Sequence, residues 1–451
     1  MASRSVLIVS PHFPPINAPD HQRVRMALPY FREFGWEPVV LSVAAEYSES
    51  SRDETLTATL PEDTEIHRVR ALPAQVTRTV GLGSLALRSL PYLRAKGNEI
   101  LASRKFDLVF FSTSLFPVMA LGPVWHKRFS IPYVLDLQDP WLTDYYDSND
   151  STPPGGQIKY GFSKILGKLL EPRVVREAAH IIVVSPAYPE LLRERYAKLN
   201  GKFTVLPFAA SETDFETAKV MNLEHGVFRP RDGLIHWVYA GAVGSRMEKS
   251  LRAFFLALKS ELGHDEQLAA RLRIHFVGTD YADRSRARKT VAPLAAEYGL
   301  SEIVHETTDR LPFLTTLKLL SDADALLVFG SNDPSYTASK IFPYILARKP
   351  LLVIVHEQSS VADIVRQCRA GVVVTFGQED RVESIAERIS KEWGNLPVTN
   401  SHTDWPEFAR YGARAMTASL AGVFDEAVAV SARPIQSNPT TAPDLPSFAD
   451  R

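Results

Sequence analysis

The sequence has a single cysteine, Cys368, among its 451 residues. A disulfide within the chain is therefore excluded, and this cysteine usage fits a reducing compartment such as the cytoplasm. Apolar runs of about 18 residues, the length that a membrane-spanning helix needs, are also missing. The apolar run at 6–9 is too short for the core of a signal peptide and is typical of a first strand.

Neither basic nor acidic residues are in excess. The chain carries 51 Lys and Arg against 52 Asp and Glu, which gives a net charge of −1. A nucleic acid or another polyanion is therefore not expected as a partner. The length favours two or three domains over a single core.

Short apolar runs alternate with longer amphipathic segments along the whole chain, as in doubly wound α/β proteins. In the first half the predicted strands are 5–10, 38–43, 65–69, 106–112, 133–137, 180–185 and 204–206. After about residue 215 the pattern starts again, with predicted strands at 234–240, 273–277, 303–306, 325–329, 351–355 and 371–376. Helices are expected between the strands, among them 26–34, which would end at Gly35.

The segment 325–355 predicts a strand–loop–helix–strand unit with its helix at about 339–347. In such a unit the loop and the helix start meet at the carboxyl edge of the sheet, where backbone N–H groups favour an anion. Thr337 or Ser339 is the expected N-cap, and Lys340 adds a cation beside it. Pro343 fits only if this helix begins late, because proline has no N–H group.

The two halves predict two Rossmann-like domains, 1–215 and 216–404, that face a common cleft. A helix at 405–430 is expected to pack back toward the first domain, and the Pro- and Ser-rich residues 431–451 are expected to be disordered. Ligands of such folds bind at sheet edges and domain interfaces, so the chain should be an enzyme or a binding protein.

Several stretches resemble family 4 glycosyltransferases. In the first half they are IVSPHFPPINAPDHQRV (8–24) and IPYVLDLQDPW (131–141). In the second half, WVYAGAVGSRMEKSLRAFFLAL (237–258) and the 325–355 unit are similar to the donor-binding domain of that family. The resemblance covers the chain to about residue 430. It implies the GT-B fold and retaining sugar transfer from a nucleotide-sugar, which is a substrate, with no metal and no other cofactor.

The resemblance places the donor in the second domain. It implies that Lys249 and Arg246, after the Gly241–Gly244 turn, stabilise the donor diphosphate as the glycosidic bond breaks. Two solvated charges at a helix start are the alternative. The other expected donor-binding residues are Gly241, Gly244, Gly278, Ser335, Tyr336, Thr337, Ser339 and Lys340.

The chain departs from the family at the donor. Many members have two glutamates eight positions apart for the sugar and the ribose, and Ser335 and Pro343 stand there in this sequence. A glycine pair that members present in the first loop is also absent. These departures motivate a second hypothesis, a catalytically inactive GT-B scaffold that binds a partner or a glycan. A Rossmann oxidoreductase fits poorly, since no GxGxxG follows the first strand.

The acceptor is expected on the first domain. Asp139, after the strand 133–137, could orient an acceptor hydroxyl or receive its proton, although an Asx turn before Pro140 explains it equally well. Asp136 lies inside the strand and is expected to be structural. The first loop offers further acceptor-side candidates, which are His12, Asn17, Asp20, His21 and Arg23.

Residues 68–105 and 158–176 combine Lys and Arg with apolar residues. A basic amphipathic surface is typical of peripheral contact with the inner face of a membrane, and a core-packed helix with a solvated basic face is the alternative. The sequence therefore predicts a glycosyltransferase that acts on a glycan or lipid-linked acceptor in polysaccharide or glycolipid assembly.

Overall fold

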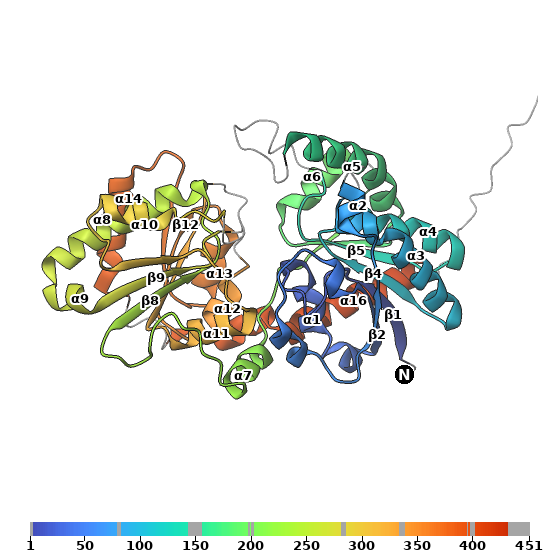
Figure 1. Cartoon of the computed structure of the whole chain (residues 1–451), viewed down its shortest axis with the longest axis horizontal. Coiled ribbons are helices and arrows are strands. Elements are labelled where there is room, and N and C mark those ends of the chain that lie inside the picture. Colours follow the sequence, from blue (N-terminus) through green and yellow to red (C-terminus); the bar gives the residue numbers. More distant parts are fainter. Residues whose placement is uncertain are drawn as a thin grey trace, which may run out of the picture.

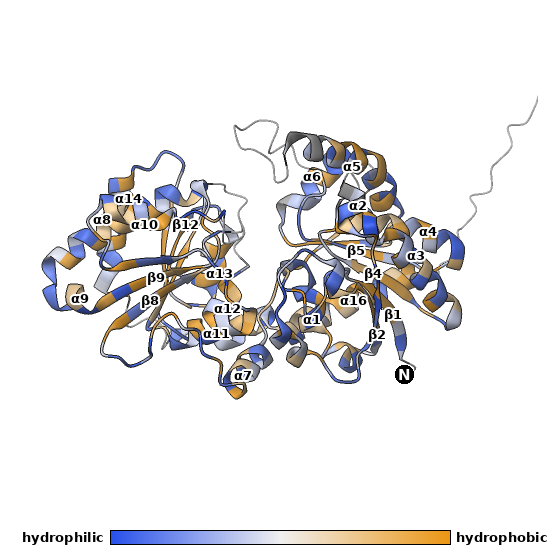
Figure 2. Ribbon diagram, viewed as in Figure 1, coloured by the Kyte–Doolittle hydropathy of each residue, from blue (hydrophilic) through white to orange (hydrophobic). Residues whose placement is uncertain are grey.

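The structure of the protein is a computed structural model that describes residues 3–78, 83–142, 156–196, 199, 203–280, 286–332, 339–394, 396 and 402–431. Its strands form two separate parallel sheets with helices on both faces (Figure 1). Figure 2 shows that the strands of both sheets carry mostly apolar residues, as expected when helices cover both faces. The tail 431–451 that was predicted to be disordered lies, from residue 432 on, outside the described residues.

The first sheet has the strand order β3-β2-β1-β4-β5-β6-β7. The order reverses between β1 and β4, which is where doubly wound sheets place a ligand. Its strands are β1 (Arg4–Val9), β2 (Trp36–Val43), β3 (Glu65–Val69), β4 (Leu108–Ser112), β5 (Tyr133–Leu137), β6 (His180–Val183) and β7 (Phe203–Val205). Its helices are α1 (Gln22–Ala27), α2 (Ala74–Arg78), α3 (Leu85–Ser103), α4 (Leu121–Phe129), α5 (Gln157–Glu177) and α6 (Ala187–Arg195).

The second sheet has the order β10-β9-β8-β11-β12-β13 and reverses between β8 and β11. Its strands are β8 (Ile235–Ala240), β9 (Leu272–Val277), β10 (Val304–Thr307), β11 (Ala325–Phe329), β12 (Leu351–His356) and β13 (Val372–Phe376). Its helices are α8 (Glu248–His264), α9 (Glu266–Arg271), α10 (Val291–Glu297), α11 (Phe313–Asp322), α12 (Ile341–Leu346), α13 (Ser360–Gln367) and α14 (Val382–Glu392).

The chain passes between the two halves twice. The first passage leads through α7 (Glu212–Val220), and the second runs from α15 (Trp405–Phe408) into α16 (Ala413–Ser431). The two passages pair at one point, where Ala210 N donates to Tyr411 O at 3.1 Å and Ala413 N donates to Ala210 O at 2.9 Å. Beyond this point α16 packs on the first sheet, and Phe424 stacks on Phe31 with ring centroids 5.8 Å apart.

The predicted fold class is confirmed, and each predicted strand overlaps a strand of the structure. Two predicted helices differ from the structure. The helix expected at 26–34 is α1 followed by a separate 3-10 turn at Phe31–Phe34, because Pro29 cannot continue the hydrogen bonding. The helix expected at 405–430 is broken at Gly412, whose extended backbone joins the pairing with Ala210.

The helix of the 325–355 unit begins late. α12 starts at Ile341 with Lys340 as its N-cap, and no side chain caps it. The expected N-cap role of Ser339 is therefore wrong. Pro343 stands in the first turn, where an N–H group would have no partner within the helix, so proline is tolerated there.

Candidate functional site

A cavity of about 430 Å³ lies between the two halves of the molecule. The first loop and α1 line one side, and the crossing segment before and within α7 lines its base. The second half contributes the end of β8, the loop after β10, α11 and α12. The residues that line it include Asn17, Ala240, Gly241, Arg310, Phe313, Ser339, Lys340, Pro343 and Tyr344. The ends of strands from both sheets thus converge on one cavity, as predicted for the ligand site.

Gly241 and Lys340 meet at this cavity. Gly241 follows β8 and has a φ of +136°, a backbone conformation that residues with a side chain rarely adopt. A Cβ atom at position 241 would lie only 2.5 Å from Lys340 Nζ. Glycine is therefore needed here for two reasons, its backbone conformation and the close approach of the lysine. The two predicted donor elements, the turn after β8 and the start of α12, come together in space.

One tyrosine holds the Lys340 side chain, and another holds the helix that follows it. Lys340 Nζ donates to Tyr239 Oη at 2.7 Å and lies 4.1 Å from the centre of the Tyr239 ring. Tyr344 of α12 accepts from Ala240 N at 2.7 Å and donates to Ala240 O at 3.1 Å, which ties α12 to β8. Burial, together with the nearby Arg310 cation, lowers the pKa of Lys340 to about 7. An anion bound here would favour the charged ammonium group and so raise its pKa again.

Arg310 is a cavity residue that the sequence reasoning missed. It follows β10, and its Cγ would lie 3.4 Å from a Cβ atom at position 278, so the predicted donor residue Gly278 packs against it. The only sequence signal was a basic residue shortly after a strand, at a carboxyl edge. Arg310 brings a second cation close to Lys340 at this end of the cavity.

The other predicted donor residues lie elsewhere. Lys249 Nζ donates to Gly377 O at 3.2 Å and to Gln378 O at 2.6 Å, and so ties the start of α8 to the loop after β13. Arg246 accepts at its carbonyl from Asn332 N at 3.1 Å. Gly244 has a φ of −105° and is exposed, and a Cβ atom there would meet nothing within 4 Å. Among the described residues that line the cavity, none of these three is present.

The turn before α12 is described only in part. Ser339 lies at the cavity and is exposed. Ser335, Tyr336 and Thr337 lie outside the described residues, so their predicted contacts with the donor stay predictions.

On the acceptor side, Asp20 organises the first loop. Its carboxylate accepts from His12 Nδ1 at 3.0 Å, from Thr113 Oγ1 at 2.9 Å and from Ser114 N at 3.2 Å. Burial acts to raise the pKa of Asp20, but the hydrogen bond and charge of His12 and the other partners outweigh it, and the pKa is lowered. Asp20 is thus a buried carboxylate that links the loop after β1 to the end of β4.

Arg23 is fully buried and has structural partners. Its Nε donates to Asp136 at 2.9 Å, and a terminal nitrogen donates to Leu206 O at 2.8 Å. Asp136 itself is fully buried, as expected for a structural residue inside β5. His21 is buried too, and its Nε2 lies 2.8 Å from Ile16 O. Of the first-loop candidates, only Asn17 lines the cavity.

Asp139 stands at the end of β5, at the carboxyl edge of the first sheet. Although much of its side chain is open to solvent, the surrounding protein desolvates the carboxyl group and, with the charge of Asp20, raises its pKa. A raised pKa makes a carboxylate a better proton acceptor. Asp139 is outside the cavity but close enough to Asp20 to interact with it.

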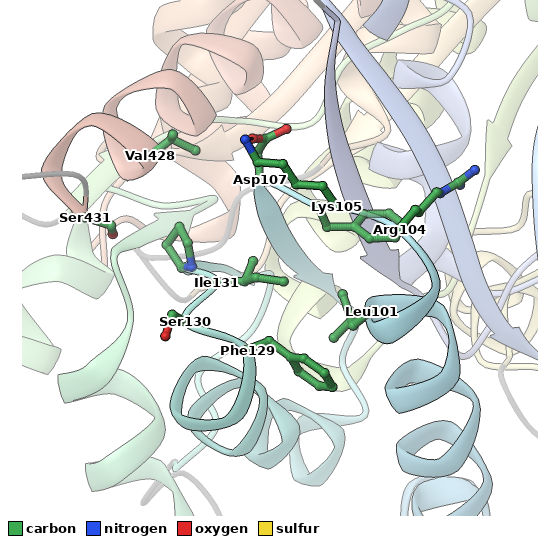
Figure 3. Close-up of a pocket in the computed structure, with 11 residues that line it drawn as sticks. Leu101, Arg104, Lys105, Asp107, Phe129, Ser130, Ile131, Val428 and Ser431 are labelled. Carbon is green, nitrogen blue, oxygen red and sulfur yellow. Dashed lines mark ion pairs between the residues drawn. The ribbon is translucent and has the colours of Figure 1, made fainter.

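A second hollow, of about 380 Å³, lies at the opposite edge of the first sheet (Figure 3). It is formed before β4 and β5 and beside the end of α16, and its cations are already paired. Arg104 pairs with Glu65 at 2.7 Å, and Lys105 lies 3.6 Å from Asp107. The strands' amino ends surround it, so it is not the site predicted from the fold.

Within the described ranges, no group of three or more His, Cys, Asp and Glu side chains could hold a metal ion. None of the described helices is long and apolar enough to cross a membrane.

The chain is similar to several known proteins. Residues 21–209 match the sequence model of the glycosyl transferase 4-like domain. A comparison with curated proteins finds no match. Among solved structures, sucrose-phosphate synthase from Thermosynechococcus elongatus superposes with a TM-score of 0.59 and 14% identity, over 95% of this chain and 100% of that one. HepE from Anabaena, solved with UDP and glucose, has a TM-score of 0.57 and 14% identity, over 94% and 99%.

A glycosyltransferase from Rickettsia africae is similar to the same extent, with a TM-score of 0.58 and 14% identity over 94% of this chain and 99% of that one. At such identities the structures show the fold alone, which is the two-domain GT-B fold. The sequence match covers residues 21–209 and shows that this part of the chain is a glycosyl transferase 4-like domain.

Proposed function

We propose that the protein transfers a sugar, with retention, from a nucleotide-sugar to a glycan or lipid-linked acceptor in polysaccharide or glycolipid assembly. The observation that carries the proposal is the approach of Lys340 to Gly241 in the cavity between the two halves. A lysine held by Tyr239 beside a bare glycine backbone, with Arg310 near it, suits a diphosphate. Retention rests on the family resemblance.

In this proposal the chain's own cations act on the leaving group. As the glycosidic bond breaks, negative charge grows on the diphosphate, and Lys340 and Arg310 stabilise it. Lys249 and Arg246 stay proposed contacts of the donor, although neither lines the cavity and two carbonyl groups already accept from the Lys249 ammonium. Closure of the two halves over the donor would exclude water, which otherwise competes with the acceptor.

The acceptor hydroxyl is assigned to the edge of the first sheet. Asp139, with its raised pKa, is the proposed group that orients this hydroxyl or receives its proton. His12, held by Asp20, and Asn17 lie on the same loop and are the proposed neighbouring contacts. Arg23 is left out, because all its observed partners are structural.

UDP is the first ligand to test, since the similar HepE structure contains UDP. Pro343, which lines the cavity, offers no side-chain acceptor for a ribose hydroxyl. We therefore expect recognition of the diphosphate to contribute more to affinity than recognition of the ribose.

The test is a screen of nucleotide-sugars by thermal shift, followed by an assay of nucleotide release. We expect at least one donor to raise the melting temperature and to be turned over. Lys340→Met should lower donor affinity at least about tenfold, as expected for the loss of a charge-assisted contact. Lys259→Met, which removes an exposed lysine of α8, is the matched control. No donor binding, or full activity of Lys340→Met, would refute the proposal and favour a non-catalytic scaffold.

A further inference from the structure

An exposed apolar row runs along α5. The exposed fractions are 46% for Phe162, 69% for Ile165 and 74% for Leu169. Positions three and seven apart lie on one side of a helix, so the three side chains form one row. The opposite side is in the core, where Val174 and Val175 are buried. Large apolar side chains that gather on one exposed face mark an interaction surface.

The charges around this row are mainly positive. Lys168, Arg173 and Arg176 are exposed on the same helix, and Lys164 is half-buried beside Tyr160. Of the described acidic residues of α5, Glu177 pairs with Arg173 at 2.9 Å and Glu171 is buried against Arg195 and Tyr196. The apolar row therefore lies in a positive field that acidic groups of the helix do not cancel.

The other basic segment, 68–105, lacks such a row among its described residues. On α3, Leu85, Leu93 and Ile100 are buried in the core of the first half. Arg88 is also buried and donates to Leu72 O at 2.8 Å and Tyr47 O at 3.0 Å. For the described part of this segment the core-packed alternative fits the structure, whereas α5 keeps the features of a membrane-binding helix.

α5 is also joined to the proposed acceptor edge. Gly167 lies against the residues that follow Asp139, since a Cβ atom there would be 2.6 Å from Leu142 Cδ2 and 3.2 Å from Trp141 Nε1. Trp141 in turn stacks on Phe116 with centroids 5.5 Å apart. In Figure 1, α5 lies at the top of the first half, on its outer surface. A surface bound by α5 would therefore lie beside the acceptor edge of the first sheet.

We propose that α5 docks the protein on an anionic lipid bilayer, with Phe162, Ile165 and Leu169 inserted among the headgroups and the flanking cations on anionic lipids. Positive charges beside a short apolar row match a lipid surface better than a second, equally positive copy of the same helix. The inference rests on the proposed function in one respect, since it makes the acceptor a lipid-linked molecule.

The experiment is sedimentation of the full chain with vesicles of phosphatidylcholine alone or of equal parts phosphatidylcholine and phosphatidylglycerol. We expect binding to the anionic vesicles only. The double variant Ile165→Ser/Leu169→Ser should weaken it by about tenfold or more, since buried apolar area sets the binding strength. Lys164→Gln/Lys168→Gln should weaken it and lower its dependence on salt. The matched control is Val220→Ser on α7, a side chain that is 84% exposed and distant in sequence.

Equal binding to both vesicles, no binding, or wild-type binding by the Ile165→Ser/Leu169→Ser variant would overturn the proposal. Analytical ultracentrifugation gives a further test. A wild-type dimer that the Ile165→Ser/Leu169→Ser variant no longer forms would also overturn the proposal, because the apolar row would then be an interface between two copies of the chain. The assay uses no sugar donor. Failure of the donor screen with intact vesicle binding would refute the proposed transfer alone, and the reverse result would refute only the membrane contact.

Discussion

The contact between Gly241 and Lys340 joins residues that are far apart in the chain. Each was predicted as a donor residue from its own segment, but their contact was not. It arises because β8 and β11 are neighbours in the sheet, so that the segments following them share one edge. The strand order depends on long-range pairing, which one sequence does not contain. The same reason explains why Arg310, on the loop after β10, was missed.

Gly241→Ala tests the close approach. The new methyl group would meet Lys340 Nζ, and the φ of +136° would strain any residue but glycine. We expect a loss of more than about 1 kcal/mol in the free energy of unfolding, since alanine is poorly tolerated at positive φ. Affinity for UDP should fall too, as measured by calorimetry. Gly244→Ala is the control, because its φ is −105° and the space around it is open. Equal effects of the two substitutions would contradict the assignment.

The lowered pKa of Lys340 predicts that donor binding depends on pH. In the free protein the pKa is about 7, so at pH 8 the amine is mostly neutral. A bound diphosphate favours the charged form and raises the pKa, so binding should take up a proton. Affinity for UDP should then fall between pH 7 and pH 9, by up to about tenfold for each pH unit. Calorimetry in buffers with different ionisation enthalpies measures the proton. Lys340→Met should show neither effect, and if it keeps the pH dependence another group is responsible.

The types of the helices and strands could be predicted from the sequence, but two helix breaks could not. Strand and helix types follow from the apolar periodicity and were predicted. The breaks at Pro29 and Gly412 were not, and the second arises because Gly412 pairs with Ala210 of the other passage between the halves. Local preference favoured one continuous helix there, and a distant backbone partner ended it. Arg25 of α1 holds the first passage between the halves in place. Its guanidinium donates to both oxygens of Asp214 on α7, at 2.7 and 2.6 Å.

Asp53 links the halves at the start of α11. Its carboxylate accepts from Phe313 N, the first residue of that helix, at 2.7 Å, and it is buried. Asp53→Ala should cost about 1.5–3 kcal/mol, the usual value of a hydrogen bond to a charged group. It should also raise the radius of gyration in small-angle scattering, because the halves lose a contact.

The control for Asp53→Ala is Asp265→Ala, which removes the N-cap of α9 within the second half. This control should lower stability by about 1 kcal/mol, but it should leave the scattering unchanged. If Asp53→Ala also leaves the scattering unchanged, this hydrogen bond does not hold the halves together.

Histidines from three neighbouring strands of the second sheet gather at one place. The second sheet holds a cluster in which His236 Nδ1 lies 3.0 Å from His275 Nε2, and the His275 and His305 rings are 5.6 Å apart. Phe228, from the passage between the halves, stacks on His236 with centroids 4.0 Å apart. The passage is therefore anchored on a histidine cluster in which burial lowers the pKa of His275 and His305. This could not be predicted from the sequence, since the histidines come from three strands.

Acid should destabilise this half of the molecule first. Burial lowers the pKa of His275 to about 3, with further lowering by His236, His305, His225 and Arg273. Because the folded-state pKa lies below the unfolded value, the full contribution to stability is present above about pH 6.5 and is lost as the pH falls toward 3. At pH 5 the loss from His275 alone is about 2 kcal/mol. Urea unfolding at pH 7.5 and pH 5 measures it.

His275→Gln should reduce the stability difference between the two pH values, because glutamine does not take up a proton. His264→Gln, at the exposed end of α8, should leave that difference as in the wild type. A neutral glutamine can still hydrogen-bond to His236, so the variant should fold at pH 7.5 and the comparison isolates the charge. An unchanged pH dependence in His275→Gln would mean that this histidine is not protonated on unfolding. The acid sensitivity would then have to come from other histidines with a lowered pKa, such as His225 and His305, or from the fully buried His21 of the first half, whose pKa is about 4.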